Sequence, residues 1–181
     1  RPAFFVALTS MAYYKDLHEY LAALEKAGKL TRIRSRINKD TELHPLVRLQ
    51  FLGLPEEKRT AFLFENITDS NGKKYRMPYV VGCAAATREI YALGMMCKAE
   101  EIGDKWLYAQ THPIPPKLVE SGPVQEVVHT GDAIKNEGIL MLPIPISTPG
   151  FDNAPYTSAS NWITKDPETG VRNVGNYRGQ V

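Results

Sequence analysis

The chain has 181 residues, of which 43% are apolar and 23% charged, and its formal net charge is +2. A chain of this length can bury a hydrophobic core and form one or two domains. The small net charge argues against a nucleic-acid partner or an anionic membrane surface. Every apolar run is also shorter than the ~20 residues that cross a bilayer. We therefore expect a soluble globular protein.

Residues 1–11 are mostly apolar and contain a single basic residue, Arg1. A short signal peptide is one interpretation of this pattern. The other, which we favour, is a native start at Met11, so that residues 1–11 are an extension or an unstructured start.

The next hundred residues alternate between helical and strand patterns. Leu17, Tyr20, Leu21 and Leu24 recur at helical spacing after Asp16, which can cap a helix, and this predicts a helix over 16–27. The same reasoning predicts helices at 41–52, 87–96 and 100–106, and strands at 30–37, 61–65 and 79–84. We expect an α/β domain over residues 12–115.

The pattern becomes entirely β after a proline-rich linker at 112–116. It predicts strands at 124–129, 156–164 and 171–181, and an edge segment interrupted by prolines at 140–146. We expect residues 116–181 to begin an antiparallel β domain. A final hairpin of 156–164 with 171–181 leaves an open edge, which proteins normally cover, so we also expect a truncated chain.

The two cysteines, Cys83 and Cys97, lie far apart in the sequence and lack the spacing of a metal site. We interpret them as free, buried thiols, and this predicts a reducing, cytoplasmic location. The four histidines form no H-x-H or H-x-x-x-H pair, so we expect each on the surface or in packing rather than as a ligand.

The last strand concentrates polar side chains. Alternation predicts that Asn173, Gly175 and Tyr177 share one face, and that the other face carries Asn176, Arg178 and Gln180. Arg178 can bind a carboxylate or phosphate through two charge-assisted hydrogen bonds, and the amide oxygen of Asn173 suits Mg²⁺ or Mn²⁺. The two residues could hold opposite ends of an elongated ligand.

The glycines of this strand add to the hypothesis, because Gly175 and Gly179 leave room for a flat ring or a phosphate to approach the backbone. They match neither the dinucleotide fingerprint nor the P-loop. The alternative is an exposed hairpin whose polar residues simply face water.

Four segments resemble UbiD-type decarboxylases and occur in the order of that family, so the chain from 14 to 181 is similar to the N-terminal portion of the family. They are 14–30 (YKDLHEYLAALEKAGKL), 62–66 (FLFEN), 142–145 (LPIP) and 163–178 (ITKDPETGVRNVGNYR). The resemblance implies that residues 116–181 supply the first strands of an FMN-binding, flavin-reductase-like split β-barrel.

The resemblance also implies a function. Relatives are carboxy-lyases that use prenylated FMN, with a divalent metal (Mn or Mg) and a potassium ion near its phosphate. They catalyse the reversible non-oxidative decarboxylation of aromatic or α,β-unsaturated carboxylic acids. Loss of CO₂ from an sp² carbon leaves a carbanion, so the cofactor must supply an electron sink. The implied partners are a flavin prenyltransferase, which supplies the cofactor, and further copies of the chain in a homo-oligomer.

By position, the resemblance assigns the cofactor contacts to a small set: Asn173, Asn176, Tyr177, Arg178 and Ser158. Asn173 matches the metal-ligating asparagine. Arg178 matches the arginine that orients the substrate carboxylate, which is the catalytic assignment. Gln180 is a weaker match, and we interpret Trp162 as packing.

Two departures from the family pattern affect the expected activity. Ser147 and residues 152–155 (DNAP) stand where many relatives carry a histidine and Asp-Gly-Gly or Asp-Ala-Gly, so we expect an unusual substrate pocket. In relatives the second metal ligand and the acid–base carboxylates lie beyond the position of residue 181, and Glu65, Asp132 and Glu168 match nothing catalytic. We therefore expect no turnover by the chain alone.

Two other functions stay open. One is an FMN-binding split-barrel oxidoreductase that uses unmodified flavin. The other is a non-catalytic or split subunit whose partner supplies the missing carboxylates.

Overall fold

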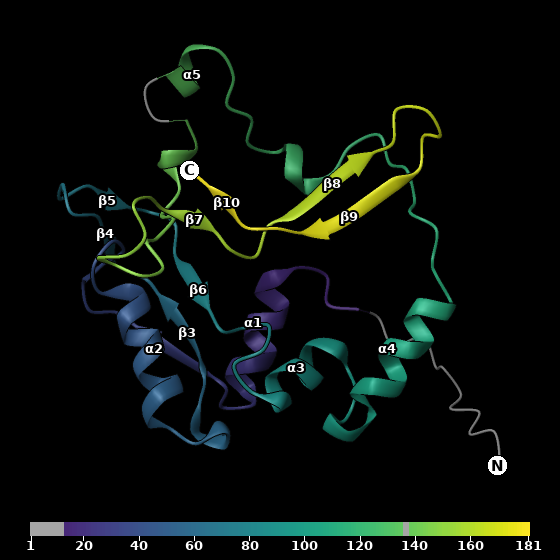
Figure 1. The fold of residues 1–181 in the computed structure, drawn as a ribbon, viewed down its shortest axis with the longest axis horizontal. Helices are drawn as coiled ribbons and strands as arrows, with labels where there is room; N and C mark the ends of the chain where they lie inside the picture. The colour runs from purple at the N-terminus through teal and green to yellow at the C-terminus, as the bar shows by residue number, and fades with distance from the viewer. Residues whose placement is uncertain (1–12, 136–137) are drawn as a thin grey trace.

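The computed structural model describes residues 13–135 and 138–181, so the predicted extension at 1–11 lies outside the described residues. Its helices are α1 (Leu17–Lys26), α2 (Leu43–Gly53), α3 (Arg88–Met95), α4 (Ile102–Thr111) and α5 (Asp132–Lys135). Its strands are β1 (Leu30–Ile33), β2 (Ile37–Asn38), β3 (Ala61–Phe64), β4 (Ile67–Thr68), β5 (Lys74–Tyr75), β6 (Tyr79–Val81), β7 (Tyr156–Thr157), β8 (Asn161–Lys165), β9 (Arg172–Asn176) and β10 (Gly179–Gln180). Figure 1 shows α1 to α3 packed with the early strands, and the β8–β9 hairpin projecting above them.

The four predicted helices are confirmed, and their start signals are local. The Asp16 carboxylate accepts the backbone N–H of Glu19 at 2.9 Å at the start of α1, and the Thr87 hydroxyl accepts that of Ile90 at 3.0 Å at the start of α3. Such caps satisfy N–H groups that have no partner within the helix. The last helix, α4, continues to Thr111, past its predicted end at 106.

The early strands form two small sheets. In the first sheet, β3 pairs in parallel with β1 and antiparallel with β6. The helix α2 lies between β1 and β3 in the chain. In the second sheet, β4 pairs in parallel with β2 and antiparallel with β5. Residues 34–36 lie opposite only residues 65–66, so one strand carries an extra residue where the chain passes from one sheet to the other. The prediction of one continuous strand at 30–37 was therefore wrong.

The hydrophobic core lies in this α/β part, in two clusters that share β3 between them. The largest side chains with almost no exposed surface are Phe64, Leu24, Leu43, Ile67 and Ile90. Burial of each such side chain stabilises the fold by about 1.5–3 kcal/mol relative to leaving it in water.

Two strand predictions after the linker were wrong. Residues 123–125 form one turn of 3-10 helix that overlaps the start of the predicted strand 124–129, and Val124, Val127 and Val128 are exposed. The predicted edge segment at 140–146 begins with a 3-10 turn at Gly138–Met141 and continues without strand pairing, with Ile144 and Pro145 buried. The prolines in these segments have no backbone N–H to donate to a neighbouring strand, and this favours irregular conformations.

The terminal hairpin is confirmed between β8 and β9, which pair antiparallel from Asn161↔Asn176 to Lys165↔Arg172. Residues 166–170 form its turn. The Asp166 side chain accepts the N–H groups of Glu168 and Thr169, and Gly170 adopts φ +72°, which glycine tolerates without strain. These backbone donors hold the pKa of the Asp166 carboxyl below its ordinary value.

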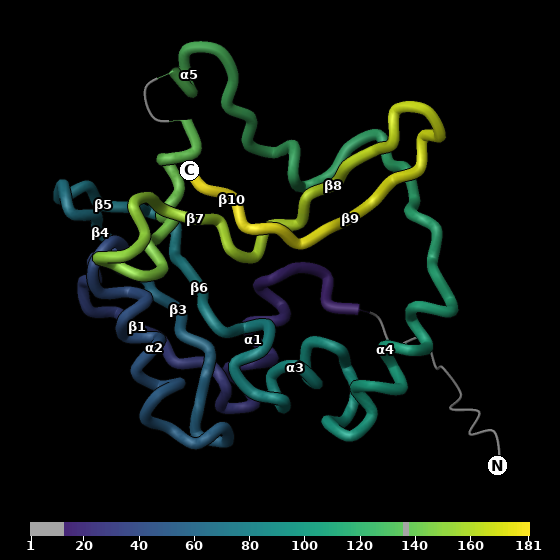
Figure 2. Tube along the Cα trace, viewed as in Figure 1, coloured from purple at the N-terminus to yellow at the C-terminus, as the bar shows by residue number. Residues whose placement is uncertain are grey.

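The outer ends of the two predicted strands form a separate pair, β7 with β10. Figure 2 shows the last segment of the chain returning from the hairpin to lie beside β7. The α/β architecture is thus confirmed, whereas the described strands of residues 138–181 form two short antiparallel pairs and no closed barrel. Among the described helices, none combines the length and the apolar character that a bilayer span requires.

Candidate functional site

The predicted site residues gather around a β-bulge in the terminal hairpin. Between the pairs Thr157↔Gly179 and Asn161↔Asn176, residues 158–160 lie opposite residues 177–178. One strand therefore carries one residue more than its partner, and the Tyr177 N–H donates to the Ser160 carbonyl at 3.3 Å within the bulge. A bulge of this kind bends the strand and redirects side chains, and it is common beside functional sites.

Two aromatic rings of the chain cover the glycines of this hairpin. The Trp162 indole N–H donates to the Tyr177 carbonyl at 2.8 Å, and a Cβ at Gly179 would meet the indole at 3.0 Å. A Cβ at Gly175 would lie 2.1 Å from the Tyr177 ring. The chain's own rings thus occupy the Cβ side of both glycines, and the approach of a flat ligand to their backbone stays a prediction. Trp162 packs as predicted.

Asn173 and Tyr177 lie on one face of the hairpin, as predicted. The register pairs Thr164 with Asn173 and Trp162 with Gly175, so the four positions share a face, and the Tyr177 ring covers that face at Gly175. The opposite face carries Asn176 together with the exposed apolar pair Ile163 and Val174. Asn173 and Asn176 are both exposed.

Arg178 and Gln180 both lie against Tyr156 of β7. The Arg178 guanidinium carbon is 5.5 Å from the centroid of the Tyr156 ring, a cation–π distance. The Tyr156 hydroxyl donates to the Gln180 side-chain oxygen at 3.2 Å, and the two residues are register partners. The bulge ends the regular alternation after Asn176, so Arg178 and Gln180 belong to the β7–β10 pair rather than to the face of Asn176. Sequence reasoning missed Tyr156.

Ser158, the first residue of the bulge, is exposed, and Tyr79, the first residue of β6, lies near it. Burial raises the pKa of the Tyr79 phenol above its ordinary value, and the interaction with Ser158 partly opposes that rise.

The polar groups at the bulge fit a flavin phosphate and a carboxylate in chemical type: an exposed carboxamide, a hydroxyl and a guanidinium. Metal ligands are scarcer. Across residues 13–135 and 138–181, no three His, Cys, Asp or Glu side chains lie close enough together to hold an ion. The carboxamide of Asn173 offers one neutral oxygen of the kind that Mg²⁺ or Mn²⁺ accepts. Both cysteines are free thiols, as predicted, but they are half-buried rather than buried.

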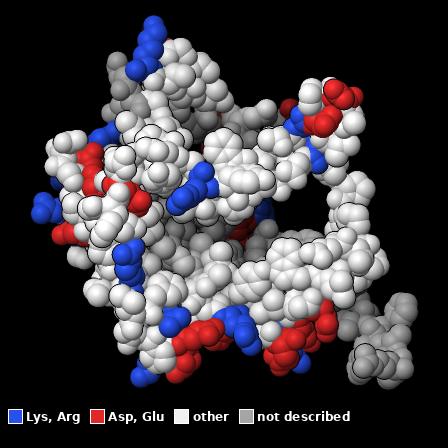
Figure 3. All heavy atoms as spheres, viewed as in Figure 1, with Lys and Arg blue, Asp and Glu red and all other residues white. Residues whose placement is uncertain are grey.

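Charged side chains concentrate on the α/β part. In Figure 3 basic and acidic groups alternate along its lower edge, while most of the hairpin is uncharged. The basic run of the first strand is taken up by ion pairs: Arg32 contacts Glu25 at 2.7 Å and Glu65 at 2.6 Å, and Arg34 contacts Glu65 at 3.4 Å. Of the basic residues of this run only Arg32 lies in β1, and Arg34 lies in the link between the two sheets.

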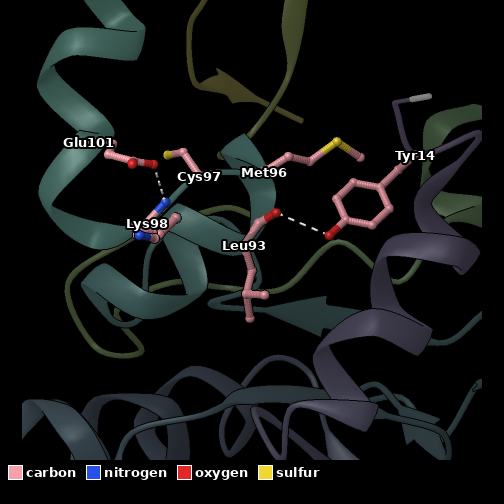
Figure 4. Close-up of a pocket in the computed structure, with 7 residues that line it drawn as sticks. Tyr14, Leu93, Met96, Cys97, Lys98 and Glu101 are labelled. Carbon is pink, nitrogen blue, oxygen red and sulfur yellow. Dashed lines mark hydrogen bonds between the residues drawn. The ribbon is translucent and has the colours of Figure 1, made fainter. Parts of the chain in front are cut away.

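Two cavities lie away from the bulge. One of about 610 Å³ opens between the start of α1 and the end of α3, where the Tyr14 hydroxyl donates to the Leu93 carbonyl at 3.1 Å and the Lys98 N–H donates to Glu101 at 3.0 Å (Figure 4). A second, of about 520 Å³, lies between α2 and the loop around Phe151. None of the predicted site residues lines either cavity.

The fold is that of a carboxy-lyase family. Residues 21–109 match the 3-octaprenyl-4-hydroxybenzoate carboxy-lyase N-terminal domain, and residues 117–181 match the 3-octaprenyl-4-hydroxybenzoate carboxy-lyase Rift-related domain. The chain belongs to the UbiD family and corresponds to its N-terminal portion.

Similar proteins include an uncharacterised protein of Aquifex aeolicus, which is 34% identical in an alignment 190 residues long. The alignment covers 93% of this chain and 36% of the relative. The solved structure of the UbiD-class enzyme HmfF from Pelotomaculum thermopropionicum in complex with FMN is 33% identical, with a TM-score of 0.73 over 90% of this chain and 33% of that one. An evolved dimeric form of HmfF in complex with prFMN is 34% identical, with the same TM-score over 90% of this chain and 35% of that one.

Vanillic acid decarboxylase from Sedimentibacter hydroxybenzoicus, in an open form, is also similar. It is 29% identical, with a TM-score of 0.72 over 93% of this chain and 36% of that one. The chain thus spans about one third of the length of the relatives that it matches.

Proposed function

We propose that this chain provides the N-terminal part of a prenylated-FMN site in a carboxy-lyase. The enzyme acts reversibly and without net oxidation on an aromatic or α,β-unsaturated carboxylic acid. The supporting observation is the bulged hairpin, which brings Ser158, Tyr177 and Arg178 together in a chain whose similar structures hold FMN and prFMN. When bound, the prenylated flavin supplies the electron sink that decarboxylation at an sp² carbon requires.

Each residue of the site has a proposed role. Arg178 orients the substrate carboxylate, because its fork can donate two charge-assisted hydrogen bonds. Asn173 supplies one ligand to a divalent metal, Mn or Mg, beside the flavin phosphate, where a potassium ion also binds. Ser158, Asn176 and Tyr177 contact the cofactor. Their exposure leaves them accessible to a ligand of this size.

The remaining features of the proposal concern the whole protein. Residues 12–115 form the α/β domain, and residues 116–181 contribute the first strands of a split β-barrel. The acidic metal ligands and the acid–base carboxylates lie in parts of the family that this chain does not match. We therefore expect no turnover from this chain alone. A flavin prenyltransferase supplies the cofactor. We further propose a homo-oligomer, a proposal supported by the dimeric form of HmfF.

A second candidate is a flavin enzyme or subunit that uses unmodified FMN, since one similar structure holds FMN itself. Absorbance spectra and the mass of the extracted cofactor distinguish the two candidates. A prenylated flavin supports the decarboxylase, and FMN that is reduced by a nicotinamide without CO₂ release supports an oxidoreductase.

The assignment is tested in a family-length protein that contains these residues. Arg178→Ala should abolish CO₂ release from a panel of aromatic and acrylic acids while retaining bound flavin, and Arg178→Lys should restore little because it cannot form the fork. Asn173→Ala should lower the metal and flavin content measured after desalting. Normal turnover by Arg178→Ala, or unchanged cofactor and metal content in Asn173→Ala, would contradict these roles.

A further inference from the structure

The bulge leaves one peptide group of the proposed site outside the strand pairing. β9 pairs as far as Asn176, and β10 pairs from Gly179 onward. Tyr177 and Arg178 stand between these positions without a register partner. The carbonyl of Tyr177 belongs to the planar peptide group that leads into Arg178, so the direction of this carbonyl helps to set how the Arg178 side chain leaves the backbone.

Trp162 of β8 supplies a hydrogen-bond donor to this carbonyl. Its indole N–H donates to the Tyr177 carbonyl at 2.8 Å. A backbone carbonyl outside a ladder otherwise relies on water, and exchanging water does not hold the group in one orientation. The indole therefore fixes the peptide group between Tyr177 and Arg178.

The same indole lies against the residue that follows Arg178. A Cβ at Gly179 would meet the indole at 3.0 Å, closer than side chains normally approach, so the absence of a side chain there is what admits the ring. From the facing strand, the Thr157 hydroxyl donates to the Gly179 carbonyl at 3.4 Å. Contacts thus hold the backbone on both sides of Arg178.

A second ring holds the other end of the Arg178 side chain. The guanidinium carbon lies 5.5 Å from the centroid of the Tyr156 ring. The Tyr156 N–H in turn donates to the carbonyl of Pro145, which is fully buried, at 3.4 Å. Groups that bind a ligand must be held within about 0.5 Å of the productive geometry by neighbours that are themselves locked in place. An arginine side chain has several rotatable bonds, so it meets this requirement only when its backbone and its guanidinium are both held.

We infer that Trp162 is a positioning residue of the proposed site, whose indole N–H fixes the peptide group before Arg178 and so directs the guanidinium to the substrate carboxylate. This inference rests on the proposed function, in which Arg178 orients that carboxylate. It goes beyond packing, because packing requires a ring at residue 162 but no N–H. Trp162 itself is assigned no contact with substrate or cofactor.

The first test needs no substrate and follows the Nε–H resonance of Arg178 in NMR spectra of this chain. Trp162→Phe keeps an aromatic ring and removes the donor. The Arg178 resonance should move toward its position in Tyr156→Leu, which lacks the ring beside the guanidinium. The amides of Ile163 and Val174, a register pair of the hairpin, should keep their wild-type shifts and so report that the pairing is intact.

Gly179→Ala and Trp106→Phe complete this test. Gly179 has an ordinary φ, so alanine there keeps the backbone but pushes the indole away, and it should shift the Arg178 resonance in the same direction. Trp106→Phe is the matched control, since this indole is 47% exposed against 48% for Trp162 and donates to the Tyr91 hydroxyl in the α/β part. It should leave the Arg178 resonance unchanged. An unchanged resonance in Trp162→Phe or in Gly179→Ala would overturn the inference.

The second test uses a family-length protein loaded with flavin, with cinnamate and its neutral amide as probes. The wild type should bind the acid more tightly than the amide. Trp162→Phe should reduce that preference about five- to tenfold, the effect of one hydrogen bond, and Trp106→Phe should retain it. Adding Trp162→Phe to Arg178→Ala should cause no further loss, because Trp162 acts through Arg178. Additive losses would overturn the inference.

The two tests distinguish failure of this inference from failure of the proposed function. Equal binding of acid and amide by the wild type would count against the proposed function. A shifted Arg178 resonance in Trp162→Phe would then still support the role of Trp162 in placing Arg178. A preference for the acid that persists in Trp162→Phe would overturn the inference while the proposed function stands.

Discussion

At the scale of single residues, Gly175 shows how the hairpin uses its own aromatic rings. Its backbone has an ordinary φ, so only the Tyr177 ring prevents a side chain there. The ring is more than half exposed and is free to move outward, so a substitution at Gly175 displaces the ring rather than unfolding the strand.

We predict that Gly175→Ala shifts the Tyr177 ring and costs less than about 1 kcal/mol of unfolding free energy, below the usual cost of overpacking in a core. The displacement is measured as loss of the NMR contact between the Tyr177 ring and the backbone of residue 175. Gly103→Ala in α4, where a Cβ meets nothing within 4 Å, serves as the control and should raise stability by up to about 1 kcal/mol. Retention of the ring contact in Gly175→Ala would contradict the described packing.

Tyr20 gives a prediction about pH. Burial, together with Cys83 and Tyr14, raises its pKa from an ordinary value of 10.0 to about 12. The folded state therefore favours the neutral phenol, and this contribution to stability is complete below pH 10 and is lost as the pH rises through 12. Urea unfolding between pH 9 and 12 should show a fall in unfolding free energy that is smaller in Tyr20→Phe. Equal slopes in the two proteins would refute the prediction.

At the scale of elements, helix starts were predictable because their signals are local. Asp16 and Thr87 each precede a helical pattern, and each caps its helix in the structure. The strand prediction at 124–129 failed because it rested on the valines of this segment alone. A strand also needs a neighbouring strand to pair with, and the local sequence does not show whether one is present. The bulge at 158–160 could not be predicted for the same reason, since it depends on the register of two separate strands.

The cap of α3 provides the prediction at this scale. Thr87 is buried, and its hydroxyl accepts the Ile90 N–H at 3.0 Å. Thr87→Val keeps the volume but leaves that N–H without a partner, so we expect a loss of about 1–2 kcal/mol in unfolding free energy. Thr87→Ser retains the hydroxyl and should lose much less. Equal losses in the two variants, measured by chemical denaturation, would assign the effect to packing instead of capping.

At the scale of the whole molecule, stability and chemistry reside in different parts. The buried clusters belong to the α/β part, whereas the hairpin that carries the proposed site is largely exposed. Composition and pattern predicted the α/β part because its elements repeat a clear amphipathic period. The roles of Asn173 and Arg178 were assigned from the family resemblance. The spacing of polar residues alone fits a ligand site and a hairpin that simply faces water equally well.

We therefore predict unequal effects for two truncations of side chains. Phe64→Ala, at a position with no exposed surface, should lower unfolding free energy by about 3–5 kcal/mol, while Ile163→Ala, at a position that is 67% exposed, should change it by less than about 1 kcal/mol. Thermal unfolding followed by circular dichroism measures both. Comparable losses would mean that the hairpin contributes to the cooperative core.

The extra residue between Tyr156 and Asn161 also limits how the sequence can change length. Side chains alternate between the two faces of a strand with a period of two. Removing one residue of 158–160 would therefore move the side chains of β8 to the opposite face relative to those of β7. The turn at 166–170 carries no such restriction, because residues added beyond the last pair leave the alternation of both strands intact. Insertions and deletions should therefore accumulate at the tip of the hairpin and be absent from its bulge.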